Sequence, residues 1–315
     1  MRCAYNRCMN RRNFVKYLAL GAELLALRTG SLFAKDITKS VLTRTIPSSG
    51  EAIPMIGMGT WITFNVGPIP PLIQARTEIL KTFFAMGGQL IDSSPMYGSA
   101  EEVLGRCFQQ LNDTESLFAA TKVWTANTSE GLQQVQDSER LWGLNQMDLE
   151  QIHNLVNWRE HLKSLRRLKD EGRIRYIGIT TSHGRRHAEL EAIMKSEPLD
   201  FVQLTYNLGR REVENRLLPL AQDKGIAVIA NRPFGGGALI DRLQRSAPLP
   251  TWAGEVGAAN WPEFLLKFVV SHPALTCAIP ATSQVEHMRE NMGACYGRLP
   301  NAAQRERMVR YLEEL

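Results

Sequence analysis

The chain has 315 residues, of which 44% are hydrophobic, and a formal net charge of +5. Six of its 37 basic residues and one of its 32 acidic residues lie within residues 1–34, so the remainder carries 31 of each. A neutral remainder gives no electrostatic reason to expect binding to nucleic acid or to an anionic membrane. The five cysteines form no Cys-x-x-Cys motif and no cysteine–histidine spacing typical of zinc, so no metal site is expected.

Residues 1–34 resemble a twin-arginine export signal. Arg11 and Arg12 precede an apolar run over Tyr17–Leu27. That run is 11 residues long and contains Glu23, so it is too short and too polar to span a bilayer. We therefore expect folded export by the twin-arginine machinery, a periplasmic location and no stable membrane insertion of the mature form. An ordinary basic N-terminal helix is the alternative, and the protein would then be cytoplasmic.

From residue 41 onward, apolar strand-like runs alternate with amphipathic helical segments. Eight strands separated by helices predict a parallel sheet, and eight strands close a barrel, so we expect one (β/α)8 TIM barrel over residues 41–315. The predicted strands are Met55–Gly59, Gln89–Ile91, Leu117–Thr121, Leu149–His153, Tyr176–Ile179, Phe201–Leu204, Ala227–Ala230 and Thr276–Ile279. The predicted helices include Arg76–Met86, Ala100–Gln110, His161–Glu171, His187–Lys195, Asn215–Lys224, Trp261–Ser271 and Asn301–Leu315.

Two local features qualify this pattern. Ser99 and Glu102 have the Ser-x-x-Glu spacing of a capping box, which predicts that the second of these helices starts there. The stretch Phe234–Asn260 contains three consecutive glycines and two prolines, so we expect a long irregular segment that is functional or partly mobile.

Polar side chains close three successive predicted strands. Asp92 ends the second strand, Tyr97 lies in the loop after it, Lys122 ends the third strand and His153 ends the fourth. The carboxyl ends of parallel strands share one face of a barrel, and neighbouring strands are roughly 4.8 Å apart. We therefore expect these four side chains to lie within contact range. Each of them alone has an ordinary structural explanation, but together they predict an active site.

This set resembles the catalytic tetrad of the aldo/keto reductase family. The resemblance implies an oxidoreductase that reduces an aldehyde or ketone to an alcohol with NADPH or NADH. It extends over nearly all of residues 41–315. The motifs that carry it are Ile91–Gly98, Thr121–Val123, Gln151–Asn154, Gly172–Ile179, Ile279-Pro280 and Arg289-Glu290-Asn291.

The resemblance assigns a role to each member of the set. Tyr97 would donate a proton to the carbonyl oxygen, but an ordinary phenol titrates near 10 and is a weak acid at neutral pH. Lys122 would lower the pKa of that phenol, and Asp92 would hold Lys122 in its charged form. His153 would donate a hydrogen bond to the carbonyl oxygen and orient it.

The resemblance also implies a set of cofactor contacts. Thr180, Thr181 and Gln203 would face the nicotinamide, and Asn231 stands where many members have a stacking aromatic ring. Phe234 and Gly235 would border the pyrophosphate, and the adenosine end would lie at a helix start near residue 284. The full implied set is Thr60, Thr180, Thr181, Gln203, Asn231, Phe234, Gly235, Thr282, Ser283, Gln284 and Asn291.

Three tryptophans follow predicted strands on the face of the tetrad. They are Trp61, Trp124 and Trp158. We expect at least two of them to line the substrate cleft, which would favour small apolar or aromatic carbonyl compounds.

Two other functions stay open at this point. A desolvated Lys122 could form a Schiff base in a barrel aldolase, although a neighbouring Asp92 keeps a lysine protonated. The chain could instead be a non-catalytic nicotinamide-binding subunit that regulates a partner. If the enzyme is exported with its cofactor, either a periplasmic redox partner reduces that cofactor again or the protein cycles between two substrates on one bound cofactor.

Overall fold

The computed structural model describes residues 40–111 and 113–315. The predicted export signal at residues 1–34 lies outside these ranges. Eight parallel strands form one sheet in the order β10-β9-β8-β7-β6-β5-β4-β3. A parallel bridge between Ile56 and Ala278 joins its two edges, so the sheet closes into a barrel, and the predicted fold is confirmed. The strands are β3 (Met58–Gly59), β4 (Leu90–Asp92), β5 (Phe118–Val123), β6 (Met147–Ile152), β7 (Ile174–Thr180), β8 (Phe201–Thr205), β9 (Ala227–Asn231) and β10 (Cys277–Ala278).

Successive residues of each strand point alternately into the barrel and out toward the helices. The inward residues at the strand starts form an apolar cluster that includes Leu90, Phe118 and Phe201. Ile46 and Ile53 belong to the same cluster and come from an antiparallel hairpin, β1 (Thr43–Thr45) and β2 (Ala52–Pro54). The hairpin therefore covers the amino-terminal end of the barrel, and polar inward residues are left for the carboxyl end.

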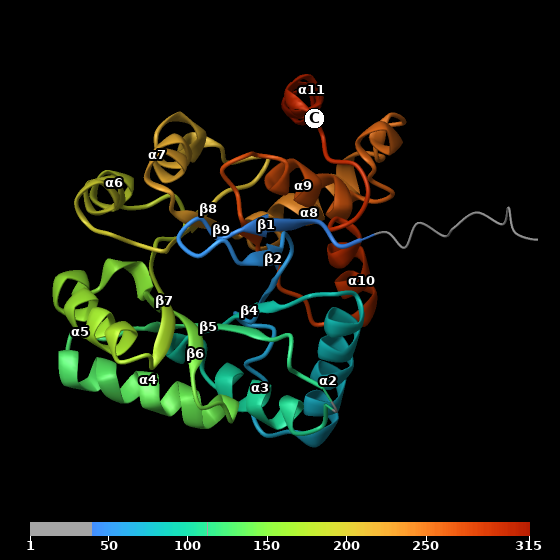
Figure 1. Cartoon of the computed structure of the whole chain (residues 1–315). Coiled ribbons are helices and arrows are strands. Elements are labelled where there is room, and N and C mark those ends of the chain that lie inside the picture. Colours follow the sequence, from blue (N-terminus) through green and yellow to red (C-terminus); the bar gives the residue numbers. More distant parts are fainter. Residues whose placement is uncertain (1–39, 112) are drawn as a thin grey trace, which may run out of the picture. The chain divides into compact units, whose positions relative to one another are not determined.

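The helices lie outside the strands (Figure 1) and bury their apolar faces against the outward strand residues. They are α2 (Pro70–Ala85), α3 (Ala100–Phe108), α4 (Thr128–Trp142), α5 (Trp158–Asp170), α6 (His187–Ser196), α7 (Leu217–Lys224), α8 (Ala238–Ser246), α9 (Trp261–Val270), α10 (Val285–Gly293) and α11 (Ala302–Glu313). The seven predicted helices are all present within a few residues, apart from α5 and α2, which begin earlier than expected.

Two helices fall where none was predicted. Helix α4 buries only Gly131, Val135, Ser138 and Trp142, so its apolar stripe is too weak to read from the sequence. Helix α8 buries Leu243 and lies inside the stretch that was expected to be irregular. That expectation is wrong for residues 238–246, because the glycines end just before the helix begins.

The capping box predicted at the start of α3 is also wrong. Ser99 makes no capping bond to the helix backbone. Its Oγ donates to Asn65 Oδ1 at 3.0 Å and accepts the N–H of Gly67 at 2.8 Å. The preceding loop therefore occupies the hydroxyl group that the helix would have used.

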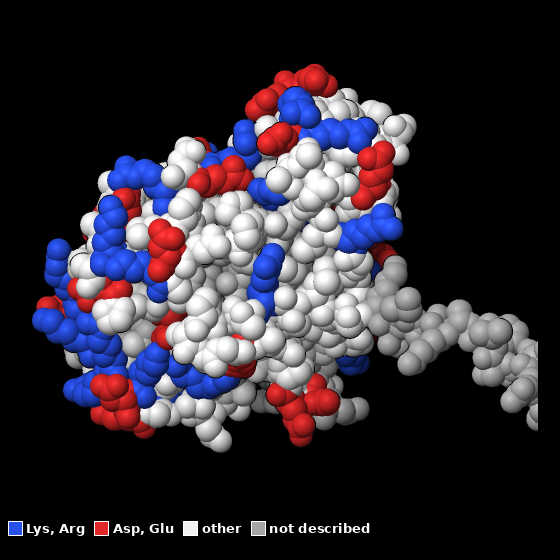
Figure 2. Space-filling model, turned by 45° about the horizontal axis from the view of Figure 1, so that its top comes forward, with Lys and Arg blue, Asp and Glu red and all other residues white. Residues whose placement is uncertain are grey.

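The surface carries charges of both signs. Figure 2 shows basic and acidic side chains close to one another along the left and upper edges of one face. Within residues 40–111 and 113–315, no helix combines the length and the apolar character needed to cross a membrane. The same ranges contain no cluster of three or more histidine, cysteine or acidic side chains suited to a metal ion.

Candidate active site

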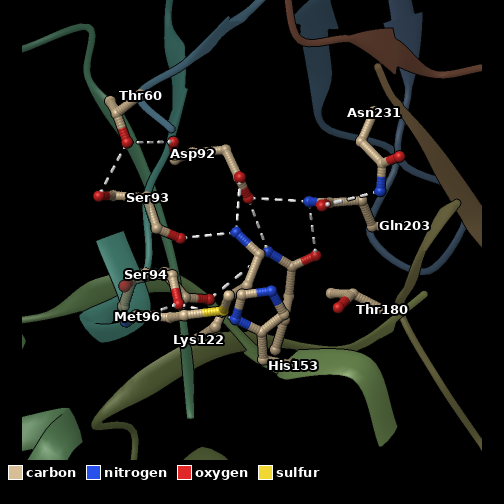
Figure 3. Close-up of polar contacts among 12 residues, drawn as sticks. Thr60, Asp92, Ser93, Ser94, Met96, Lys122, His153, Thr180, Gln203 and Asn231 are labelled. Carbon is tan, nitrogen blue, oxygen red and sulfur yellow. Dashed lines mark hydrogen bonds and ion pairs between the residues drawn. The ribbon is translucent and has the colours of Figure 1, made fainter. Parts of the chain in front are cut away.

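A buried ion pair lies at the carboxyl ends of two neighbouring strands. Asp92 ends β4 and Lys122 lies in β5. Lys122 Nζ is 2.6 Å from Asp92 Oδ2 and 2.6 Å from the carbonyl oxygen of Ser93 (Figure 3). The side chains of Lys122 and Asp92 are 0% and 2% exposed, so each charge is compensated by protein and not by water. The strand order thus brings these two residues together as expected.

Two glutamines satisfy the second oxygen of Asp92. Gln151 Nε2 on β6 and Gln203 Nε2 on β8 lie 3.0 and 2.8 Å from Asp92 Oδ1. Gly178, on the strand between them, leaves room for this arrangement, because a Cβ there would lie 2.9 Å from Gln151 Cγ. The sequence analysis missed Gln151 as a site residue. Gln151 lies two positions before His153 on the same predicted strand, so both side chains face the barrel interior, and this spacing could have identified Gln151 as a site residue.

The ammonium group of Lys122 stays charged inside the barrel. Burial alone would lower the pKa of Lys122, but the neighbouring Asp92 and Tyr97 raise it by more, and the pKa lies above its ordinary value. This charge is therefore a permanent feature of the site at neutral pH.

Tyr97 lies above that ammonium group, in a short helical turn after β4. Lys122 Nζ is 5.1 Å from the centroid of the Tyr97 ring. Burial raises the pKa of the Tyr97 phenol above its ordinary value, and the charge of Lys122 offsets only part of this rise. Lys122 acts on this pKa in the expected direction, but desolvation outweighs the attraction of an ammonium group that Asp92 already neutralises, so the net pKa lies above the ordinary value. Tyr97 is therefore a protonated phenol at neutral pH.

His153 follows β6 and packs edge-on against Tyr97, with ring centroids 5.7 Å apart. Its Nδ1 is 2.8 Å from Ser94 Oγ, which also accepts the N–H of Met96 at 3.2 Å. The Ser94 hydroxyl can donate its proton to Nδ1 while it accepts from Met96, and in that arrangement the ring proton lies on Nε2. Burial, followed by the charge of Lys122, lowers the pKa of His153 to about 3. The ring is thus neutral and offers one N–H donor.

The backbone after β6 is held in an unusual conformation. Asn154, Leu155 and Asn157 have φ values of 52°, 57° and 45°, which a leucine rarely adopts. The N–H of Asn154 donates to Thr180 Oγ1 at 3.0 Å, so the first of these residues is tied to β7. Backbone strain of this kind is concentrated at functional sites.

A cleft of about 600 Å³ opens over the polar layer. Asp92, Tyr97 and His153 line it, and Lys122 is buried beneath them. Most of the side chains implied for the cofactor also line it. These are Thr60, Thr180, Thr181, Gln203, Asn231, Phe234, Thr282 and Asn291.

Gly235, Ser283 and Gln284 do not line this cleft. Gly235 faces a neighbouring cavity, because the chain reverses at a turn of three glycines with positive φ and presents the next two to the cleft. Gln284 precedes helix α10 and donates its backbone N–H to Thr282 Oγ1 at 3.0 Å. That tight turn leaves Thr282 as the side chain that faces the cleft.

Two buried polar atoms of the cleft lack a hydrogen-bond partner within the described residues. They are Thr181 Oγ1 and Asn291 Nδ2. Buried polar atoms are nearly always hydrogen-bonded, so unpaired ones in a cleft indicate a ligand with complementary polar groups. A nicotinamide dinucleotide has such groups at both ends, and these residues fit it. Asn231, in contrast, is already engaged, since its Nδ2 donates to the carbonyl oxygen of Thr181 at 2.9 Å.

The expectation that at least two of the three tryptophans line the cleft is wrong. Trp61 lines it, whereas Trp124 and Trp158 do not. Trp158 begins α5 and packs, partly buried, against the hydrophobic core, with its ring centroid 4.3 Å from the guanidinium carbon of Arg159. The guanidinium carbon of Arg232 lies 5.5 Å from the centroid of the Trp61 ring, which adds a cation to a rim that was expected to be apolar.

Comparisons with known proteins identify the family of this chain. A sequence model of the aldo/keto reductase family matches residues 55–306. The chain belongs to the aldo/keto reductase family. Its relatives include methylglyoxal reductase YeaE of Escherichia coli strain K12, which is 27% identical over 258 residues, or 79% of this chain and 88% of the relative.

Solved structures of aldo/keto reductases have the same fold. The enzyme from Klebsiella pneumoniae, solved with NADP and acetate, has a TM-score of 0.73 and 24% identity over 86% of this chain and 95% of its own. A thermostable aldo-keto reductase solved with the inhibitor epalrestat has a TM-score of 0.68 and 27% identity over 85% of this chain and 99% of its own. The (β/α)8 barrel is therefore the fold of these aldo/keto reductases.

Proposed function

We propose that this chain reduces an aldehyde or ketone to an alcohol with NADPH or NADH, and that Tyr97 is the proton donor. One observation carries the proposal. A protonated phenol and a neutral imidazole N–H face the same cleft, above a lysine whose charge is compensated by Asp92. Two donors that face one cleft suit an oxygen that becomes negatively charged.

The chemistry needs each of these groups. When bound, the nicotinamide supplies the hydride. His153 Nε2–H donates a hydrogen bond to the carbonyl oxygen and orients it, and Tyr97 gives its phenolic proton to the same oxygen. The ammonium group of Lys122 then stabilises the phenolate that remains. Gln151 and Gln203 hold Asp92 in place, so that the ion pair keeps its geometry through the cycle.

Tyr97→Phe tests the assignment because it removes one proton donor and little else. We expect the rate of carbonyl reduction to fall by about 10²- to 10⁴-fold, the usual contribution of general acid catalysis. Binding of NADPH, followed by quenching of protein fluorescence, should stay within about twofold. Tyr311→Phe is the matched control, since that phenol lies on α11 and donates to the carbonyl oxygen of Pro248. Undiminished turnover in Tyr97→Phe would sink the mechanism.

The substrate is best sought with a panel of small carbonyl compounds that includes a 2-oxoaldehyde. The related enzyme from Escherichia coli is named a methylglyoxal reductase, which supports starting there. The positive charge of Arg232 at the rim favours adding carbonyl compounds that carry an anionic group. Oxidation of NADPH, measured by its absorbance, ranks the panel directly.

The two competing functions predict different results. A Schiff-base aldolase needs a neutral lysine, but Lys122 is held charged by Asp92, which speaks against it. Borohydride treatment with a carbonyl substrate should therefore leave no covalent adduct. A regulatory subunit would bind nicotinamide without turning over any member of the panel. Turnover that is lost in Tyr97→Phe counts against that function.

We further propose that the chain is exported by the twin-arginine machinery and carries its cofactor with it. The paired Arg11 and Arg12 before an apolar run support this proposal. Fractionation of cells that express the full chain, with Arg11→Lys/Arg12→Lys as control, tests it. Native chain found in the cytoplasm and unaffected by the lysine pair would contradict it. Nicotinamide absorbance in the purified periplasmic protein tests separately whether the cofactor is carried along.

A further inference from the structure

A second cavity lies beside the cleft, between the loops that follow β7, β8 and β9. Its volume is about 520 Å³. Four of its lining residues are arginines, and none is an aspartate or glutamate. The four are Arg185, Arg210, Arg232 and Arg242. Arg185 and Arg232 also line the cleft, whereas Arg210 and Arg242 line the second cavity alone.

None of these four guanidinium groups forms an ion pair with a carboxylate in residues 40–111 or 113–315. Their neighbours in sequence behave differently. Arg186 pairs with Glu189 at 2.6 Å, and Arg211 pairs with Glu313 at 3.4 Å. Arg186 and Arg211 are thus neutralised at the surface, whereas the four arginines that line the cavity have no carboxylate partner in the described residues.

The cavity holds two of its cations in place through backbone contacts. Arg210 Nη1 donates to the carbonyl oxygen of His183, and Arg232 Nη2 donates to that of Gly235 at 3.3 Å. The N–H of His183 donates in turn to Thr205 Oγ1 at 2.9 Å, which anchors the loop after β7 to β8. These donors are oriented before any ligand arrives, so they lose little freedom on binding.

The arginines of the cavity act on one another and on His183 through their charges. Burial, followed by the charge of Arg210, lowers the pKa of Arg232. Burial, followed by the charges of Arg232, Arg185 and Arg210, lowers the pKa of His183. The cations therefore repel one another, and no acidic side chain that lines the cavity compensates them. An anion from outside the chain would relieve this repulsion.

We propose that the second cavity binds a phosphate group carried by a small molecule, at a subsite separate from the one that holds the cofactor. Guanidinium groups present paired N–H donors whose geometry matches phosphate oxygens. Several guanidinium groups together suit the double negative charge of a phosphate better than the single charge of a carboxylate. The cavity is large enough for a phosphate and part of the molecule that carries it. The cavity adjoins the cleft through Arg232, so the carbonyl substrate would carry the phosphate group. This substrate class rests on the proposed reductase function. Phosphate binding itself does not depend on turnover.

Calorimetric titration of the full chain with inorganic pyrophosphate tests the site directly, with potassium chloride at matched ionic strength as the reference. Arg242→Gln is the decisive variant, because Arg242 is exposed and makes no side-chain bond within the described residues. We expect it to weaken pyrophosphate binding about tenfold, the effect of one charge-assisted bond. Arg245→Gln removes the same charge from the same helix, α8, away from the cavity, and should change binding by less than about twofold.

Three results would overturn the proposal. Pyrophosphate could fail to bind at millimolar concentration, Arg245→Gln could weaken it as much as Arg242→Gln does, or saturating NADP could displace it. The last result would assign the cavity to the cofactor. None of them requires turnover, so a failure here is distinct from a failure of the reductase assignment.

Kinetics then identify the source of the phosphate. If the substrate carries it, Arg242→Gln should lower kcat/KM for glyceraldehyde 3-phosphate about tenfold and leave that for glyceraldehyde within about twofold. If a free anion binds there, added pyrophosphate should change the rate with glyceraldehyde in the unmodified protein but not in Arg242→Gln. Either pattern supports a phosphate site, and the absence of both would reduce the cavity to a charged surface without a function in turnover.

Discussion

Lys122 Nζ and Asp92 Oδ2 lie 2.6 Å apart in the closed interior of the barrel, where neither side chain is more than 2% exposed. Removing one partner leaves the other charge buried without compensation. We expect Asp92→Leu to lower the free energy of unfolding by about 3–5 kcal/mol. The double variant Asp92→Leu/Lys122→Met should recover much of that loss, since it removes both charges. Denaturant unfolding measures both.

The exposed pair of Arg106 and Glu102, at a similar distance of 2.7 Å, provides the contrast. Arg106→Met should cost no more than about 1 kcal/mol, because water screens that pair. Equal losses at the buried and exposed pairs would show that burial does not control the effect.

Carbonyl reduction should be insensitive to pH through the neutral range. Burial raises the pKa of Tyr97 above its ordinary value, so the phenol stays protonated until the pH exceeds about 10. His153, with a pKa lowered to about 3, stays neutral over the same range. The reverse oxidation needs the phenolate and should rise with pH toward the pKa of Tyr97. Profiles of kcat/KM in both directions check this, and a titration step between pH 5 and 8 in the reduction would contradict it.

Glu150 makes the stability of the fold depend on pH. Both of its carboxyl oxygens are buried without a hydrogen-bond partner in the described residues. Burial, followed by the nearby Glu101 and Glu139, raises the pKa of Glu150 well above its ordinary value. The folded state then holds a proton that the unfolded state has lost, so stability falls as the pH rises from the unfolded pKa through the folded one.

Glu150→Gln has nearly the same shape and cannot ionise. We expect it to gain stability relative to the unmodified protein as the pH rises above about 4.5, with little difference below that value. Thermal unfolding from pH 4 to 9 measures the difference, and parallel curves for the two proteins would refute the assignment.

Gly178 makes room for the hydrogen bond that Gln151 donates to Asp92. A Cβ there would lie 2.9 Å from Gln151 Cγ and 3.2 Å from Phe201 Cβ. We expect Gly178→Ala to cost about 1–3 kcal/mol of stability by overpacking the barrel interior, and to lower kcat because Gln151 moves. Gly254→Ala is the control, because nothing lies within 4 Å of a Cβ at that position. A neutral Gly178→Ala would mean that the interior can relax.

The sequence by itself was enough to predict the barrel and the tetrad. Alternation of apolar strands and amphipathic helices determines the layers, since each apolar face must be buried, and eight such units close a barrel. The order of the strands then places Asp92, Lys122 and His153 on neighbouring strand ends. These are consequences of local pattern and connectivity, which a single sequence contains.

Only the tertiary structure decides the properties that depend on several strands at once, such as burial, steric room and missing counter-charges. The pKa of Tyr97 rises because burial, a property of the assembled site, outweighs the charge of Lys122. Gln151 becomes a partner of Asp92 because Gly178 leaves it space. Three arginines of the second cavity come from separate loops and the fourth, Arg242, from helix α8. Their convergence without a carboxylate partner distinguishes them from the paired Arg186 and Arg211 beside them. Desolvation, steric room and the absence of a counter-charge are three-dimensional properties, and no spacing in the chain encodes them directly.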